Sequence, residues 1–202
     1  MVDRLGGHPS LRDVADPVIT AGGTSLVRVH AAVVSHLDVQ IYGGDVNIVP
    51  TMPLVPGTEA SGEVVDGDGF PVGTPVRVRG GGVGIRCPGA WAELVVVPES
   101  ALTVLEQPVD WTLAAAYFSP AATAWAAVHD VARVTSGERL LVTGAAGAVG
   151  SMAVQLAARH GCEVVALVGS AARRDRVPAG AAAVVAFDEW DASGDAAGHV
   201  DA

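Results

Sequence analysis

The segment LVTGAAGAVGSMAVQLAARHG, residues 141–161, carries residue types that suit phosphate binding. A short apolar run enters a glycine turn, and a stretch with helical periodicity follows. In such a unit the first glycine permits a tight turn, the second lets the backbone approach a pyrophosphate, and the third allows the helix to pack closely. The helix N-terminus adds amide donors and a positive dipole. A purely structural turn is the alternative. The sequence predicts a dinucleotide site formed by Gly144, Ala145, Ala146, Gly147, Ala148, Val149 and Gly150.

The end of the next apolar segment, 163–169, bears on which dinucleotide is bound. An NAD site carries Asp or Glu there to hold the ribose 2′-hydroxyl. This chain instead has Ser170, Arg173 and Arg174, with no carboxylate between residues 169 and 174. Guanidinium groups bind phosphate in a bidentate manner. The pattern favours NADPH, unless the two arginines only form a solvated helix face.

The segments that must position these residues alternate between the hydrophobic pattern of strands and that of helices. Apolar runs at 139–143, 163–169 and 181–187 are typical of buried strands, and residues 149–157 and 171–176 are typical of helices. This order, β-α-β-α-β, predicts a parallel sheet. Before it, a helical stretch begins at Asp110, a suitable N-cap, and Pro120 should break or kink that stretch. The segment GHVDA, 198–202, reads as the approach to a fourth strand.

The first half of the chain has a different texture. It is rich in Gly and Pro, and valines alternate with polar residues at 27–31 and 76–79, which indicates strands with one buried face. A small β-barrel or sandwich is expected. We therefore predict a β domain at 1–110, followed at 111–202 by a helix and half of a dinucleotide-binding domain.

Composition limits the classes of partner. The chain has 202 residues, half of them hydrophobic, and a net charge of −10, which argues against nucleic-acid and anionic-membrane partners. All of its cationic residues are arginine, so no lysine is available for Schiff-base chemistry. The two cysteines form no CxxC motif, and the N-terminus has no apolar signal region. These features predict a reduced, cytoplasmic protein.

Several stretches resemble the medium-chain dehydrogenase/reductase superfamily, in particular its zinc-free, zeta-crystallin-like NADPH:quinone oxidoreductases. They occur in family order from Val27 to Phe187 and include VRVHAAVVSHLDVQIYGG, PLVPGTEASGEVV, GAWAELVVVP and GERLLVTGAAGAVG. The resemblance implies a GroES-like β-barrel domain followed by a Rossmann domain. It also implies hydride transfer from NADPH to a quinone or an α,β-unsaturated carbonyl, bound in the cleft between the two domains.

The resemblance also allows the zinc branch to be tested residue by residue. Ser35 stands where that branch has a metal-binding cysteine, and Gly57-Thr58-Glu59 stands where it has Gly-His-Glu. The structural-zinc cysteine cluster is missing from the sequence. A catalytic zinc needs about three protein ligands, so we expect no metal.

The residues near the nicotinamide depart from the quinone branch, which usually has Asn at Ser35 and Tyr at Gln40. Ser35 and Thr123 match positions that border the nicotinamide. His36 and Tyr42 are the candidate catalytic residues, with His36 able to donate a proton near neutral pH. His36 could instead only bond cofactor or backbone, Tyr42 could be packing, and Thr123 could bond its own helix.

A full member of the resembled family continues well beyond three strands. We therefore expect a truncated protein whose 202 residues reduce quinones poorly by themselves, because the strands that would orient the nicotinamide are missing. The alternatives are a redox-inactive member that serves as a binding module or a cofactor-free enzyme, and a subunit completed by a partner chain. A homo-oligomer or partner covering the open sheet is expected, since bare apolar surface favours association.

Overall fold

The computed structural model describes residues 1–106 and 108–189. The chain divides into two compact units, Met1–Tyr117 and Phe118–Ala202, and each is described by itself. The expected approach to a fourth strand, at 198–202, lies outside the described residues.

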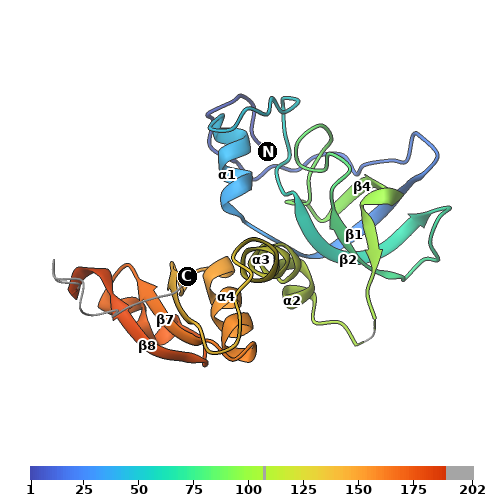
Figure 1. Cartoon of the computed structure of the whole chain (residues 1–202). Helices are drawn as coiled ribbons and strands as arrows, with labels where there is room; N and C mark the ends of the chain where they lie inside the picture. Colours follow the sequence, from blue (N-terminus) through green and yellow to red (C-terminus); the bar gives the residue numbers. More distant parts are fainter. Residues whose placement is uncertain (107, 190–202) are drawn as a thin grey trace. The chain divides into compact units, whose positions relative to one another are not determined.

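The first unit contains a five-stranded antiparallel sheet with the order β4-β1-β2-β3-β5 (Figure 1). The predicted alternation of valines is confirmed, because Val27, Val76 and Val78 are fully buried in one cluster. A 3₁₀ turn, Glu99–Ala101, joins the last two strands. The strands are β1 (Thr24–Ala32), β2 (Glu59–Gly67), β3 (Pro75–Arg79), β4 (Leu94–Pro98) and β5 (Leu102–Val104).

Two helices belong to this unit, α1 (His36–Gly43) and α2 (Trp111–Ala116). The predicted N-cap is confirmed, since the Asp110 carboxylate accepts a hydrogen bond from the Leu113 amide at 3.0 Å. Helix α2 is fixed to the sheet at its first residue. The Ser61 hydroxyl donates to the Trp111 carbonyl at 2.6 Å, and the His30 ring stacks on the Trp111 ring at 4.5 Å.

The helical stretch is interrupted, as expected, but before the proline. Helix α2 ends at Ala116, and α3 (Phe118–Trp125) carries Pro120 in its first turn. A continuous helix would need an N–H at residue 120 to reach the carbonyl of residue 116, and proline has none. The break therefore falls where the missing bond would have begun. Residues Ala126–Val131 continue as a π-helix, in which the Ala132 amide donates to the Ala127 carbonyl.

The second unit contains the expected parallel sheet, with the order β6-β7-β8. Helix α4 (Ala148–Arg159) connects the first two strands and lies beside them in Figure 1. Val154 and Ala157 of this helix are fully buried in the core with Val164 of β7. The strands are β6 (Arg139–Thr143), β7 (Glu163–Val168) and β8 (Ala181–Ala186). A 3₁₀ turn follows each of the last two strands: η3 (Ala171–Arg176) follows β7, and η4 (Phe187–Glu189) follows β8.

Across residues 1–106 and 108–189, every helix is too short or too polar to cross a lipid bilayer.

Helix α4 approaches the turn that precedes it very closely. A Cβ atom added at Gly150 would lie 2.3 Å from the Gly144 carbonyl oxygen and 3.0 Å from the Ala145 Cα. Both neighbours are backbone atoms, so neither can rotate out of the way. The third glycine of the turn is therefore required by packing.

We expect Gly150→Ala to destabilise the protein by about 1–3 kcal/mol through this overlap, although Ala is favoured over Gly inside a helix by about 1 kcal/mol. Guanidinium unfolding followed by circular dichroism measures the change. Gly169→Ala is the matched control, because a Cβ there meets no atom within 4 Å. A Gly150→Ala protein as stable as the control would contradict the packing argument.

Candidate functional site

The glycine turn between β6 and α4 is held in one conformation by backbone hydrogen bonds. Gly144 has φ +61°, a left-handed conformation that favours glycine. The Ala145 amide donates to the Leu167 carbonyl of β7 at 3.1 Å, and the Gly147 amide donates to the Gly144 carbonyl at 2.8 Å. These bonds fix the turn against the neighbouring strand.

The N-terminus of α4 suits an anion. Gly147 is its N-cap, and no side chain in the described part of the chain caps it. The first amides of a helix have no intrahelical acceptor, so those of Ala148, Val149 and Gly150 are available as donors. A Cβ added at Gly144 would meet nothing within 4 Å, which leaves open space over the turn. Together with Ala146 these residues supply the kind of donors that a pyrophosphate needs, and their role in binding one stays a prediction.

The loop after β7 places Ser170 and the two arginines at the carboxyl edge of the same sheet. Ser170 is the N-cap of η3, without a side-chain cap bond, and Arg173 is exposed with no partner among the described residues. Arg174, by contrast, forms a two-pronged ion pair with Glu189. The exposed Arg173 and the paired Arg174 are therefore not equivalent.

Two carboxylates at this edge, those of Asp188 and Glu189, were not predicted from the sequence as site residues. Asp188 accepts a hydrogen bond from the Ala171 amide at 3.2 Å, and Glu189 holds Arg174. Both belong to η4, directly after β8. The carboxyl ends of neighbouring parallel strands meet at one edge, so the residues after the third strand were the signal that could have revealed them.

In the first unit, a buried carboxylate organises Ser35 and Thr58. Asp38 is 2% exposed. Its Oδ2 accepts from the Ser35 amide at 2.8 Å and the Ser35 hydroxyl at 2.6 Å, and its Oδ1 accepts from the Thr58 amide and hydroxyl, both at 2.9 Å. The Asp38 amide donates back to Ser35 Oγ, which completes a capping box at the start of α1. Both hydroxyl protons are thus directed at one carboxylate.

The two predicted catalytic residues lie on α1 but in different surroundings. His36 is the first residue of the helix and is exposed, with no hydrogen-bond partner among the described residues. Tyr42 is half-buried, and its ring meets the Trp91 ring edge-on at 6.2 Å. Six residues separate them, which at 3.6 residues per turn places them about 120° apart around the helix. One ligand atom therefore cannot meet both from the same face of α1, and the catalytic role of each stays a prediction.

Thr123 lies in the second unit, on α3. Its hydroxyl donates to the Ser119 carbonyl of its own helix at 2.8 Å. A bond of Thr123 to its own helix is the alternative that the sequence leaves open beside a role at the nicotinamide. The side chain is exposed and keeps its acceptor capacity for a ligand.

Cysteine and metal chemistry have little support from the described residues. Burial raises the pKa of the Cys87 thiol, and burial together with Glu138 raises the pKa of the Cys162 thiol. Both thiols are therefore poorer nucleophiles than a free cysteine at neutral pH. Within the described ranges, no three His, Cys, Asp or Glu side chains are grouped to hold a metal ion.

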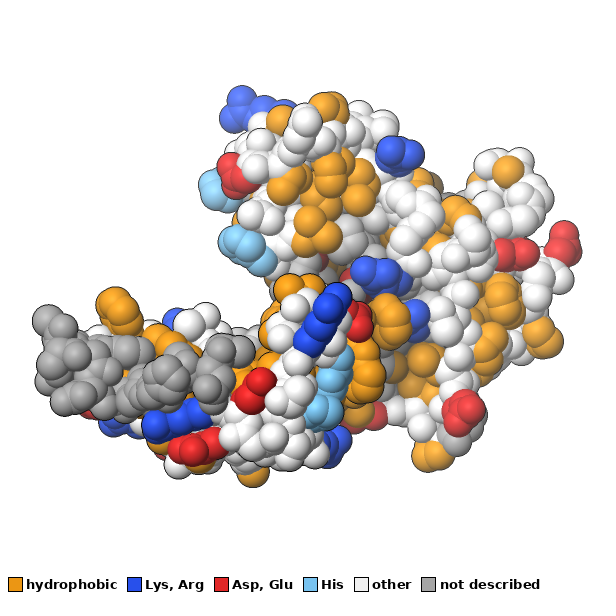
Figure 2. Space-filling model, viewed as in Figure 1, with side chains coloured by type: hydrophobic (Ala, Val, Ile, Leu, Met, Phe, Trp, Pro, Cys, Tyr) orange, Lys and Arg blue, Asp and Glu red, His pale blue; other side chains and the backbone are white. Residues whose placement is uncertain are grey.

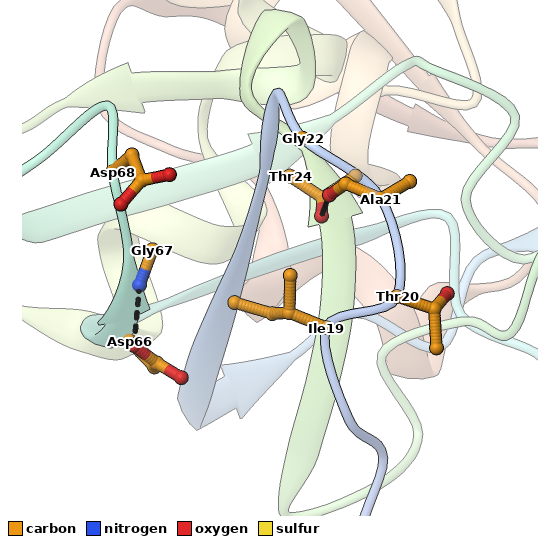
Figure 3. Close-up of a pocket in the computed structure, with 8 residues that line it drawn as sticks. All are labelled: Ile19, Thr20, Ala21, Gly22, Thr24, Asp66, Gly67 and Asp68. Atoms are coloured by element: carbon orange, nitrogen blue, oxygen red, sulfur yellow. Dashed lines mark hydrogen bonds between the residues drawn. The ribbon is translucent and has the colours of Figure 1, made fainter.

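The first unit also has two hollows that lie away from the predicted site residues. One, of about 290 Å³, is formed by residues 19–22, by Thr24 and by residues 66–68 at and just after the end of β2 (Figure 3). In it, Asp66 Oδ1 already accepts from the Gly67 amide at 2.9 Å. The other, of about 590 Å³, lies between the N-terminal segment and residues 91–94. None of the predicted site residues lines either hollow.

We expect Asp38→Asn to destabilise the protein by about 2–4 kcal/mol, because an amide must present its NH₂ group to buried donors that now face a carboxylate. Chemical unfolding measures the loss. Asp45→Asn, at an exposed position just after α1, is the control and should be nearly neutral. Equal stability of the two variants would show that the Asp38 bonds do not hold this region.

Comparison with known proteins gives these geometries a family context. Residues 21–107 match the family described as alcohol dehydrogenase GroES-like domain. The quinone oxidoreductase of Rattus norvegicus is 30% identical over 175 residues, which cover 84% of this chain and 52% of that protein. The chain spans about half the length of the curated relatives it matches.

Solved structures have folds similar to that of this chain. The quinone oxidoreductase of Thermus thermophilus, solved also in complex with NADPH, has a TM-score of 0.75 and 29% identity, covering 93% of this chain and 59% of that one. A structure described as an NAD-dependent alcohol dehydrogenase has a TM-score of 0.76 and 29% identity, covering 89% and 60%. The expected fold is confirmed as a GroES-like antiparallel-sheet domain followed by a partial Rossmann fold. The chain belongs to the medium-chain dehydrogenase/reductase superfamily, in its quinone oxidoreductase branch.

Proposed function

We propose that this chain binds NADPH on the turn at 144–150 and takes part in hydride transfer to a quinone or an α,β-unsaturated carbonyl without zinc. The observation that carries the proposal is the uncapped N-terminus of α4 beside open space at Gly144. Kinship with quinone oxidoreductases, one of them solved with NADPH, supports the same conclusion. An NAD-dependent relative has an equally similar fold, so the choice of nucleotide rests on this chain's own residues.

Different residues of the chain would bind different parts of the cofactor. The amides of Ala148 and Val149 would bind the pyrophosphate, and Ser170 and Arg173 offer a hydroxyl and an exposed guanidinium to the 2′-phosphate. Because the Ser35 hydroxyl donates to Asp38, Ser35 Oγ can serve a ligand only as an acceptor, which suits an amide NH₂. When bound, NADPH supplies a hydride from its nicotinamide ring.

The surface around α1 favours an apolar electron acceptor. Leu37, Val39 and Ile48, on or just after this helix, expose 44%, 39% and 37% of their surface. Figure 2 shows hydrophobic side chains gathered near the place where Figure 1 draws α1. Exposed apolar groups of this kind are common at ligand-binding surfaces. A quinone or an enone would match them better than a charged substrate.

Ala148→Asp tests the phosphate cradle, because the exposed residue 148 opens α4. A carboxylate there repels phosphate but favours the helix terminus by about 0.3–1 kcal/mol. We expect NADPH affinity to fall at least about tenfold through like-charge repulsion, with an unchanged or higher thermal midpoint. Calorimetric titration and thermal melting measure the two effects, and Ala148→Asn is the neutral control.

Unchanged NADPH affinity in the Asp variant would place the binding site elsewhere. The same titration with NADH checks the 2′-phosphate assignment, for which NADPH should bind more tightly to the unmodified chain. Replacing Arg173 and Arg174 together by Ala should weaken NADPH much more than NADH.

We expect no stoichiometric zinc in the purified protein, because Ser35 and Thr58 offer hydroxyls already bonded to Asp38 where a thiolate and an imidazole would be needed. Elemental analysis of protein prepared without chelators measures the metal content. A chelator should leave NADPH binding unchanged. One zinc ion per chain would overturn the zinc-free part of the proposal.

A further inference from the structure

The ends of β7 and β8 bring opposite charges together at the carboxyl edge of the parallel sheet. The Arg174 guanidinium meets the Glu189 carboxylate with two nitrogens and two oxygens, Nη1 to Oε1 at 3.2 Å and Nη2 to Oε2 closer still. Beside this pair, Asp188 accepts from the Ala171 amide. Two carboxylates from η4, the turn after the third strand, thus lie against the loop that follows the second strand.

This pairing uses the donors that a phosphate would need. A guanidinium binds carboxylate and phosphate through the same planar fork, so one Arg174 face cannot serve both at once. Arg173 next to it is exposed and has no partner among the described residues. A 2′-phosphate could therefore reach Arg173 directly, but it must replace Glu189 to reach Arg174 by that face.

The exchange is easy because the pair is partly solvated. The side chains of Arg174 and Glu189 are 39% and 49% exposed, and exposed ion pairs contribute little to stability. The pair is therefore too weak to exclude a phosphate from Arg174, although the phosphate must displace Glu189.

We propose that Glu189 is a specificity-determining residue that holds Arg174 and lowers the preference of this site for a 2′-phosphate. The inference rests on the proposed binding of NADPH to this unit. Removing the Glu189 charge frees the Arg174 fork for the 2′-phosphate. The same change leaves the pyrophosphate cradle at 144–150 untouched. Glu189 therefore sets the ratio of the affinities for nucleotides with and without a 2′-phosphate, and leaves the affinity for the rest of the nucleotide unchanged.

Two small nucleotides isolate this effect from the nicotinamide. Adenosine 2′,5′-bisphosphate carries the 2′-phosphate, and 5′-AMP lacks it. Both are titrated calorimetrically at low salt into the unmodified chain, Glu189→Gln, Arg174→Ala and the double variant. Glu163→Gln is the matched control, because Glu163 pairs with Arg139 in the same unit at 3.3 Å and its side chain is similarly exposed.

We expect Glu189→Gln to bind adenosine 2′,5′-bisphosphate about three- to tenfold more tightly, with 5′-AMP changed less than about twofold. Arg174→Ala should weaken the bisphosphate, and the double variant should match Arg174→Ala. Glu163→Gln should leave the ratio of the two affinities unchanged. Thermal melting of each variant checks that folding is retained.

Each of the following results overturns the inference and shows whether the proposed function fails with it. If both nucleotides bind but Glu189→Gln leaves their ratio unchanged, Glu189 does not control specificity, while the proposed function stands. If the gain persists without Arg174, or if Glu163→Gln gives the same gain, general charge repulsion accounts for it. If neither nucleotide binds any of the proteins, the proposed function fails together with the inference.

Discussion

The close approach of helix α4 to its own turn is the constraint on which the second unit depends. With no Cβ at Gly150, the helix starts against the Gly144 carbonyl, and the Ala145 amide reaches across to β7. Since the turn is bonded to β7, the end of that strand is fixed beside the helix N-terminus. The first amides of α4 and the residues after β7 are thereby kept at one edge of the sheet, which is the arrangement that dinucleotide-binding folds use.

The first unit reaches comparable order through a buried charge. Asp38 ties the start of α1 to the residue before β2, and four donors satisfy its carboxylate. A buried carboxylate without such partners would be costly. The same bonds occupy the hydroxyl protons of Ser35 and Thr58, the two positions that carry ligands in the zinc branch of the resembled family. The arrangement therefore secures α1, with His36 exposed at its first residue, without any need for a metal.

Local signals in the sequence predicted the second unit better than the first. The apolar run at 139–143 coincides with β6, and the helical periodicity of residues 149–157 falls within α4, because both depend on residues close in the chain. Helix α1 is not predicted, because its apolar residues Leu37, Val39 and Ile41 alternate with a period of two, which is not the periodicity of a helix. Its capping box, Ser35 with Asp38, was a readable signal. The π-helix at Ala126–Val131 has no comparable local signal.

The site residues show where reading one strand at a time is insufficient. The stretch after β7 is cationic when taken by itself, yet parallel pairing brings the end of β8 beside it. Segments 170–176 and 187–189 together contain three arginines and three acidic residues. This edge of the sheet therefore has no excess positive charge to attract an anion at long range. The proposed binding of a 2′-phosphate would therefore depend on short-range geometry, in which the Arg174 guanidinium meets phosphate oxygens in place of the Glu189 carboxylate. Sequence alone identifies the arginines, but only the pairing of strands identifies what competes for them.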